Sequence, residues 1–381
     1  MPVSPSDVLF VSKPLCPPFN DSGKLLPYLV AKHIQGIRVS VMTPRGRPLT
    51  EGTGAISEEI YPVASSFSVP MTQKLRLMYR LIGRITPPAV HFFFSPNGPT
   101  TAAARLFRAL KPDVKVIQTV MSLPAQAEAL RGALFGDVVV TWSRAAAELV
   151  GSVVKSGRRE ARVVHVPPGI EPLEPMDPVE KKKVRHDLGL PTDRPLVLYA
   201  GDLEFSSGAE VTAAAAAGIM DRTPAFFAFA CRRKTDQSLA AEKRLGEDLA
   251  PLLDRGRARI LDKTPVFHDL LRCADVQVLP AETTYAKTDI PLVLLEGLSA
   301  GVPAIVATGT PMQELVDGGA AVGVPPLEPQ ALGAALTGLL EGKGRVDALG
   351  ASGRRYVLKR HTAEAMARAH AKLYAEVLRI G

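Results

Sequence analysis

The chain has 381 residues, of which 46% are hydrophobic and 22% are charged. This length accommodates two domains, and the balance is typical of a folded, soluble protein, which excludes long disorder, collagen and a small disulfide-stapled fold. The three cysteines, Cys16, Cys231 and Cys273, are far apart, match no zinc-binding spacing and indicate a reducing compartment. With no secretory signal and no apolar stretch long enough to span a bilayer, we expect a cytoplasmic protein.

The net charge of +8 is unevenly distributed. Residues 1–172 hold 20 Lys and Arg against 11 Asp and Glu, a balance of +9, and the remainder of the chain carries −1. The first half therefore predicts an anionic partner such as a membrane face or a phosphorylated acceptor. Nucleic acid is the least favoured partner, because aromatic residues make up only 6% and do not interleave with the basic ones.

The first half alternates short apolar runs with helical patterns. This alternation predicts a parallel sheet with helices on both faces. The predicted strands are Asp7–Ser12, Ile37–Met42, Val90–Ser95, Val114–Val120 and Val138–Thr141, and the predicted helices are Leu25–Gln35, Thr100–Leu110 and Ala125–Leu134.

A proline-rich linker then separates two halves of the same pattern. Five prolines in the twelve residues Pro167–Pro178 exclude a helix interior or a central strand. Beyond it we expect strands at Leu196–Gly201, Phe226–Ala230, Arg259–Leu261, Val276–Leu279 and Pro303–Ala307, with helices at Ala209–Met220, Pro291–Ala300 and Ala363–Ile380. The sequence thus predicts an α/β protein with Rossmann-like domains at 1–170 and 171–360, facing each other across a cleft, and a terminal helix at 361–381 that packs back on the first domain.

Several segments resemble the family-4 retaining glycosyltransferases (glycosyltransferase group 1), which have the two-domain GT-B fold. The strongest is Leu279–Val306, whose second part is similar to the family's donor-site helix, with its glutamate and the small–Gly–x–Pro turn that follows. Val163–Ile170 resembles the family's strand-to-linker signature. The resemblance implies transfer of a hexose, with retention, from a nucleoside diphosphate sugar on the second domain to an acceptor hydroxyl on the first.

The donor-site segment has a physical interpretation of its own. Asp289, Ile290 and Pro291 open a helix whose free N–H groups can bind a phosphate or a sugar hydroxyl, with Leu292 next in the chain. Glu296 lies further along, where a carboxylate in an apolar run is costly unless paired. The resemblance implies that Glu296 accepts hydrogen bonds from ribose hydroxyls; the alternative is a surface glutamate that faces water.

The chain departs from the family pattern at its first glutamate. The family usually has two glutamates separated by seven residues, and the first position is Thr288 here. We expect Asp289 to bind the donor sugar in its place and Lys287 to meet phosphate. The alternative for Asp289 is that it only caps the helix.

The arginine and lysine that usually neutralise the diphosphate in this family are also missing here. Gly201 is followed by Asp202 instead of arginine, and serines replace the lysine region. Arg232 and Lys234, directly after a strand, are the expected substitutes, since ligand sites form at strand carboxyl ends; the alternative is a loop of solvated charges. We therefore expect Lys287, Asp289, Glu296 and Arg232 to act in catalysis.

The first domain offers the expected acceptor side. Asn97, Gln118 and Ser122, at the ends of two strands, are the predicted acceptor-binding residues. Gly23, in a loop similar to the family's glycine loop, is expected to let the backbone approach the donor phosphate, although a plain helix cap is equally compatible. The remaining candidates, His91, Trp142 and Cys231, are predicted to be core residues.

Residues 71–86 form a basic amphipathic pattern. Met71, Leu75, Met78, Ile82 and Ile85 share one helical face, and no acidic residue interrupts the segment. Such a helix can lie on the inner face of an anionic membrane, where a lipid-linked acceptor is presented, or bury its apolar stripe in the domain.

The leading functional hypothesis is therefore a glycosyltransferase in cell-surface polysaccharide or glycoconjugate biosynthesis. No metal or other cofactor is expected, because no Asp-x-Asp pair and no His/Cys cluster occurs. Two alternatives stay open: a non-catalytic sugar-nucleotide-binding partner subunit, and another GT-B enzyme such as an epimerase.

Overall fold

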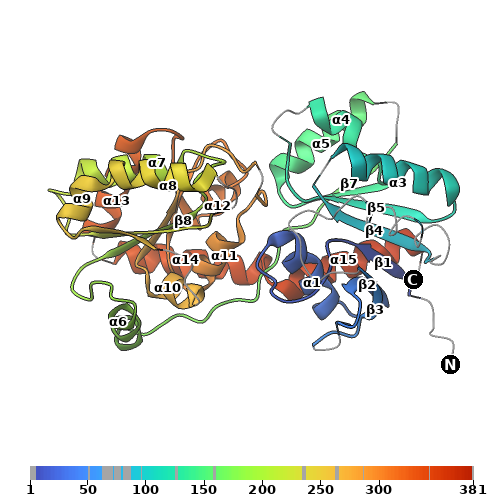
Figure 1. Cartoon of the computed structure of the whole chain (residues 1–381), viewed down its shortest axis with the longest axis horizontal. Coiled ribbons are helices and arrows are strands. Elements are labelled where there is room, and N and C mark those ends of the chain that lie inside the picture. The colour runs from blue at the N-terminus through green and yellow to red at the C-terminus, as the bar shows by residue number, and fades with distance from the viewer. Residues whose placement is uncertain are drawn as a thin grey trace. The chain divides into compact units, whose positions relative to one another are not determined.

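The computed structural model describes residues 6–49, 52–61, 72, 79, 87–95, 97–124, 128–157, 160–233, 237–261, 266–285, 287–342 and 344–379. The chain folds as two compact units (Figure 1). Unit 1 comprises Met1–Ile170, Ala286–Asp289 and Thr362–Gly381, and unit 2 comprises Glu171–Tyr285 and Ile290–His361. The end of the chain therefore belongs to the same unit as its beginning.

Unit 1 is a seven-stranded parallel sheet in the order β3-β2-β1-β4-β5-β6-β7. Helices cover both of its faces, with α1 beside α15 and α4 packed between α3 and α5 (Figure 1). The strands are β1 (Val8–Val11), β2 (Val39–Pro44), β3 (Ile56–Tyr61), β4 (Ala89–Phe94), β5 (Lys115–Val120), β6 (Val138–Thr141) and β7 (Arg162–His165). The helices are α1 (Ser22–His33), α3 (Gly98–Leu110), α4 (Glu128–Ala133), α5 (Arg144–Ser156) and α15 (Ala363–Leu378).

Unit 2 is a six-stranded parallel sheet in the order β10-β9-β8-β11-β12-β13. Its strands are β8 (Leu196–Gly201), β9 (Phe226–Cys231), β10 (Ala258–Leu261), β11 (Val276–Leu279), β12 (Ala304–Ala307) and β13 (Ala321–Val324). Its helices are α6 (Pro178–Asp187), α7 (Gly208–Ile219), α8 (Gln237–Asp248), α9 (Ala250–Asp254), α10 (Phe267–Cys273), α11 (Leu292–Ser299), α12 (Gln313–Asp317), α13 (Pro329–Glu341) and α14 (Arg345–Arg360).

The strand order fixes where a ligand site forms in unit 2. From β8 the chain moves to β9 and β10 on one side, then returns to β11, β12 and β13 on the other. The loops that leave β8 and β11 consequently diverge to opposite faces, with α7 and α8 on one face and α10 and α11 on the other (Figure 1). A crevice opens between such loops at the carboxyl ends of the strands.

A close backbone approach attaches α15 to unit 1. A Cβ atom on Gly169 would lie 2.5 Å from the Thr362 carbonyl oxygen, so only glycine fits there. Ile170 then forms a β-bridge with Thr362, and the Ala363 N–H donates to the Ile170 carbonyl at 2.8 Å. The Thr362 hydroxyl accepts from the Ala365 N–H and caps α15.

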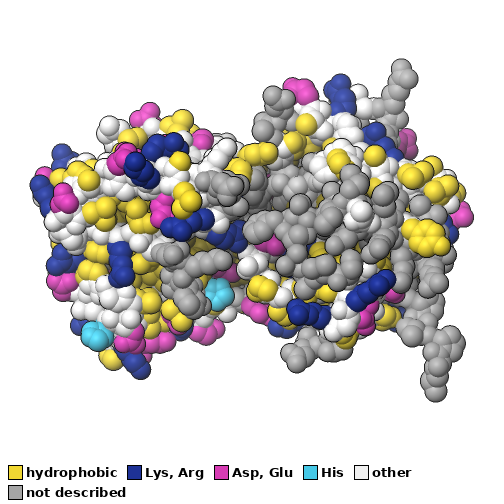
Figure 2. Space-filling view, in the orientation of Figure 1, with side chains coloured by type: hydrophobic (Ala, Val, Ile, Leu, Met, Phe, Trp, Pro, Cys, Tyr) yellow, Lys and Arg dark blue, Asp and Glu magenta, His cyan; other side chains and the backbone are white. Residues whose placement is uncertain are grey.

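The α/β class with two doubly wound sheets is confirmed. On the face of unit 2 in Figure 2, basic and acidic side chains are interspersed, in keeping with the near-neutral charge of the second half. Across the described parts of the chain, no helix combines the length and the apolar character that crossing a membrane needs.

Candidate functional site

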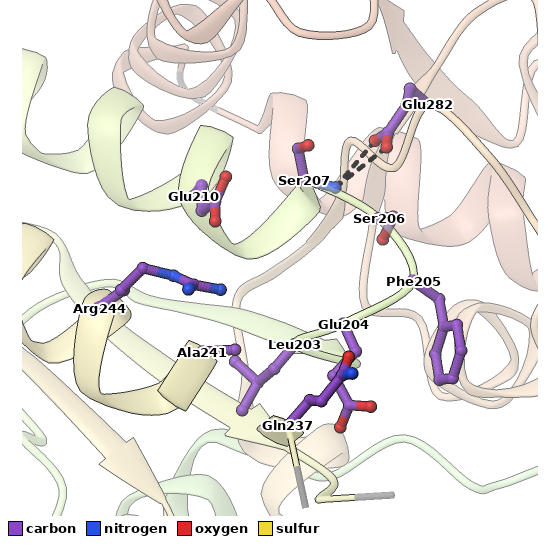
Figure 3. Close-up of a pocket in the computed structure, with 10 residues that line it drawn as sticks. All are labelled: Leu203, Glu204, Phe205, Ser206, Ser207, Glu210, Gln237, Ala241, Arg244 and Glu282. Carbon is purple, nitrogen blue, oxygen red and sulfur yellow. Dashed lines mark hydrogen bonds between the residues drawn. The ribbon is translucent and has the colours of Figure 1, made fainter. Parts of the chain in front are cut away.

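A pocket of about 320 Å³ opens at the β8–β11 switch point of unit 2 (Figure 3). Its wall is formed by the loop after β8, the first turn of α7, the first two turns of α8 and the loop after β11. The lining residues are Leu203, Glu204, Phe205, Ser206, Ser207, Glu210, Gln237, Ala241, Arg244 and Glu282. The pocket therefore lies where the topology predicts a ligand site.

Glu282 holds the amino end of α7 inside this pocket. The Ser207 N–H donates to both of its carboxylate oxygens, at 3.1 and 3.0 Å, as the dashed lines in Figure 3 show. A helix amino end attracts negative charge, so the carboxylate is stabilised where a phosphate would otherwise be favoured. Glu282 was not predicted from the sequence, because its partner Ser207 is 75 residues away in the chain.

The rest of the pocket is polar, with one aromatic wall. Three carboxylates, from Glu204, Glu210 and Glu282, line it. Among the described lining residues the one cation is Arg244, whose side chain extends from α8 toward the start of α7 (Figure 3). The Phe205 ring lies edge-on to Tyr285, with ring centroids 6.3 Å apart. Carboxylates beside an aromatic ring suit a hydroxyl-rich ring, since the carboxylates accept hydrogen bonds from hydroxyls and the aromatic ring packs on C–H groups.

The expected phosphate cations follow β9. The Arg232 side chain is exposed. Its backbone N–H donates to the Gly201 carbonyl at 3.3 Å, which fixes this loop at the carboxyl end of β8. Its neighbour Arg233 forms a bidentate ion pair with Glu242 at 2.7 Å. Gly201 is required by packing, because a Cβ there would lie 2.5 Å from the Tyr199 hydroxyl. Lys234 lies outside the described residues.

Glu296 is held on the other face of the sheet, on α11. Its side chain is only 15% exposed and lies 3.8 Å from His268 Nε2, across from α10. The Glu296 carboxylate beside it raises the pKa of His268, against the opposing effect of burial. Glu296 is therefore a half-buried, paired carboxylate rather than a surface glutamate facing water. The helix starts at Leu292, half-buried, and Ile290 before it is fully buried.

Lys287 and Asp289 are grouped with unit 1. Asp289 is fully buried and accepts a 2.8 Å hydrogen bond from the Ser143 hydroxyl, which itself caps α5 by accepting from the Ala146 N–H at 3.0 Å. The capping alternative for Asp289 is wrong, because Pro291 occupies the N-cap position of α11 and no side chain caps it. The binding of Asp289 to the donor sugar and of Lys287 to phosphate stay predictions.

Two of the three expected acceptor residues lie at strand ends in unit 1. Ser122 follows β5, and its hydroxyl lies 2.9 Å from that of Ser95, which follows β4. Asn97 caps α3: its side chain accepts from the Thr100 N–H at 2.9 Å and donates to the Ser95 carbonyl at 2.8 Å. The structure thus brings Ser95, Asn97 and Ser122 together at the carboxyl edge of the sheet.

Gln118 requires a correction. β5 runs on to Val120, so Gln118 lies inside the strand and is only 1% exposed. Its amide donates to the Ala133 carbonyl at 3.0 Å and accepts from the N–H groups of Phe135 and Gly136, at 2.8 and 3.2 Å. The side chain therefore stabilises the turn after α4 and is not available to bind an acceptor.

Replacing Gln118 by methionine should lower the free energy of unfolding of unit 1 by about 2 kcal/mol, since buried backbone groups lose their side-chain partner. Denaturant unfolding followed by the fluorescence of Trp142, the one tryptophan of the chain, measures this. Ser122→Ala, two residues past the end of the same strand, should cost no more than about 1 kcal/mol, because it loses one hydroxyl contact, to Ser95. An unchanged midpoint for Gln118→Met would contradict the structural role.

The glycine loop of unit 1 is held by an ion pair. Asp21 precedes α1, but its carboxylate accepts from Lys13 at 3.2 Å rather than capping the helix. A Cβ on Gly23 would lie 3.0 Å from this carboxylate. Asp21 thus holds the N-cap position of α1 without a side-chain capping bond, and the contact of Gly23 with a donor phosphate stays a prediction.

A buried histidine cluster lies between β4 and α15. His91 contacts the Tyr374 hydroxyl at 2.6 Å and the Thr119 hydroxyl at 2.7 Å, which confirms His91 as a core residue. His370 donates from Nδ1 to the Met366 carbonyl at 2.9 Å, and its ring lies tilted against that of buried Trp142, with centroids 5.9 Å apart. Burial lowers the pKa of His91 well below its ordinary value and that of His370 to about 4.

The predicted membrane helix at 71–86 lies outside the described residues, apart from exposed Thr72 and Tyr79. Within the described residues, no group of three or more His, Cys, Asp and Glu side chains is arranged to hold a metal ion.

Comparison with solved structures defines the class of protein: the chain has the GT-B fold. Anabaena HepE in complex with UDP and glucose matches with a TM-score of 0.76 at 15% identity, over 97% of this chain and 99% of that one. Sucrose-phosphate synthase from Thermosynechococcus elongatus matches with a TM-score of 0.75 at 18% identity, over 98% and 99%. A Rickettsia africae glycosyltransferase matches with a TM-score of 0.72 at 15% identity, over 99% and 100%.

Part of the chain also matches a glycosyltransferase family model. Residues 194–342, within the part of the chain that forms most of unit 2, match the family model described as "Glycosyl transferases group 1". The resemblance stated from the sequence is thereby confirmed for these residues. A comparison with curated proteins finds no match.

Proposed function

We propose that the chain is a retaining glycosyltransferase that moves a hexose from a nucleoside diphosphate sugar to an acceptor hydroxyl. The observation that carries the proposal is the pocket at the β8–β11 switch point, inside the segment that matches the group 1 glycosyltransferase model. HepE, which shares the fold, has been solved with UDP and with UDP-glucose, and this supports a nucleotide-sugar donor.

In this proposal the donor is bound mainly by unit 2. Glu296 accepts from the ribose hydroxyls, and Arg232, Lys234 and Lys287 with the α11 N–H groups stabilise the diphosphate as it leaves. The leaving diphosphate helps to deprotonate the acceptor hydroxyl on the same face of the sugar. Ser122 and Asn97 of unit 1 bind the acceptor, and no metal ion takes part.

Glu282 is a better candidate than Asp289 for the donor hexose. Its carboxylate lines the same open pocket as Phe205, whereas Asp289 is fully buried against Ser143. The proposal therefore assigns the hexose hydroxyls to Glu282 and Glu210, and keeps contact of Asp289 with the sugar as the weaker alternative.

A non-catalytic sugar-nucleotide-binding subunit is the second candidate. A specific observation favours it: a carboxylate, Glu282, occupies the amino end of α7, near which the family usually places cations. Both candidates are compatible with a cell-surface pathway, a lipid-linked acceptor and contact of residues 71–86 with the inner face of a membrane.

The experiment that tests the proposed function has two parts. A thermal-shift panel of UDP, GDP and ADP and their glucose conjugates should show one base that raises the melting temperature, because a ligand of the folded state stabilises it by RT ln(1+[L]/Kd). Slow hydrolysis of that donor by the purified chain supports the enzyme, and tight binding without hydrolysis or transfer supports the binding subunit. A flat panel would contradict both.

Arg232→Ala should weaken binding of the preferred nucleoside diphosphate about tenfold, since one charge-assisted contact to phosphate is lost. The neighbouring Arg233→Ala is the matched control, because Arg233 is committed to Glu242 and should leave the affinity unchanged. Isothermal titration calorimetry measures both. Equal effects of the two substitutions would show that the arginines act only as solvated charges.

A further inference from the structure

His268 on α10 is a residue that the proposed reaction has not yet used. It faces Glu296 on α11, with its Nε2 atom 3.8 Å from a carboxylate oxygen. The imidazole is 59% exposed, whereas the carboxylate is 15% exposed. A half-buried carboxylate has few alternative partners for its charge, so the imidazole is placed to fix its orientation.

We propose that His268 is a positioning residue for Glu296 and that its positive charge strengthens binding of the nucleotide sugar in mildly acidic solution. This inference rests on the proposed function, in which Glu296 binds the ribose. Two effects act in the same direction. An imidazolium restricts the rotamers of Glu296 before the ligand arrives, and it adds a positive charge beside a site that takes an anionic diphosphate.

The charged surroundings of His268 favour its protonated form. Glu296 from α11 is the main contributor, and Asp269 on the same helix adds to it. Arg272, one turn away on α10, opposes the charge but is itself paired with Glu180 of α6 and with Asp269. Two further cations of the packed elements pair elsewhere, Lys181 of α6 with Asp275 and Arg354 of α14 with Glu174.

The sign of the pH effect follows from this arrangement. The pKa of His268 is raised above its ordinary value of 6.5, so the charge is present in mildly acidic solution and is lost as the pH rises through the raised value. The diphosphate of a nucleotide sugar has no ionisation in this range, so a change in affinity reports on the protein. We expect binding about fivefold tighter at a pH of about 5.5 than at about 8.5, the effect of one partly exposed ion pair.

The test is calorimetric titration of the full chain with the nucleotide sugar identified in the thermal-shift panel, across this pH range. His268→Gln should bind equally at all pH values, with the weaker affinity of wild type at high pH. His268→Lys, which keeps its charge throughout, should also be flat but with the tighter affinity. His186→Gln is the matched control, because His186 is exposed on α6 and lies 3.4 Å from Asp187; it should keep the wild-type profile.

A second measurement needs no ligand. The pKa of His268, followed by the NMR signal of its ring protons, should fall in Glu296→Gln, since the partner charge is gone. If the wild type binds the nucleotide sugar and His268→Gln keeps the same pH dependence, this inference is wrong and the proposed function stands. If no nucleotide sugar binds at any pH, the proposed function fails and the inference fails with it.

Discussion

Glu296→Ala should weaken binding of the nucleotide sugar by about 100-fold. In the proposed function the Glu296 carboxylate accepts from two ribose hydroxyls, and hydrogen bonds to a charged group contribute about 1.5–3 kcal/mol each, so loss of both costs at least about 3 kcal/mol. The residue is half-buried, so water replaces the lost acceptor only in part. Calorimetric titration measures the change.

The ribose itself supplies the decisive control for this prediction. A 2′-deoxy nucleotide lacks one of the two hydroxyls, so wild type should bind it more weakly than the parent nucleotide, and Glu296→Ala should bind the two equally. Glu341→Ala, at an exposed glutamate at the end of α13, should behave as wild type. An alanine variant at 296 that still distinguishes the two nucleotides would show that the ribose is bound elsewhere.

Acidification should destabilise unit 1 by at least about 3 kcal/mol between a pH of about 6.5 and 4, through its buried histidines. In the folded state burial lowers the pKa of His370 to about 4 and that of His91 well below 6.5, while the unfolded chain has ordinary values. The stabilisation is complete above pH 6.5. Below this pH the histidines take up protons in the unfolded state but not in the folded state. The free energy of unfolding therefore falls by about 1.4 kcal/mol per pH unit for each histidine.

Trp142 makes this measurement specific to unit 1, because the chain has a single tryptophan, buried against His370. His370→Leu removes one of these proton-binding groups and should therefore reduce the pH slope of stability by about one proton. The variant loses only the Met366 hydrogen bond, because the Nε2 atom of His370 has no hydrogen-bond partner among the described residues. His186→Gln, at an exposed histidine, should leave the slope unchanged. A slope that survives in His370→Leu and in His91→Leu would mean that other groups cause the acid sensitivity.

The sequence predicts those elements whose apolar pattern is strong. β8 and β11 have the predicted bounds, because each is a buried run between clear breaks, apolar throughout in β8 and apolar except for Gln277 in β11. β3 was missed, since Ile56–Tyr61 carries two glutamates in an edge strand. α6 was missed for the same physical reason: its ten residues are mostly charged and only Arg185 is buried.

The candidate site is less accessible to sequence analysis because tertiary contacts define it. Glu296 could be found from a motif within one helix, and its pairing with His268 could not, since α10 and α11 meet only in the fold. Glu282 and Ser207 lie on different loops that the strand order brings together. The end of β5 was predicted correctly, but the sequence does not show that Gln118, two residues before that end, turns its side chain into the core instead of toward the ligand edge.

The attachment of α15 to the first unit has a consequence for how the protein is made on the ribosome. His91 and its strand emerge from the ribosome before Tyr374, which covers His91 in the fold and is synthesised 283 residues later. The apolar surface of β1 and β4 therefore stays uncovered until α15 has been synthesised, and we expect chaperones to bind it during this period.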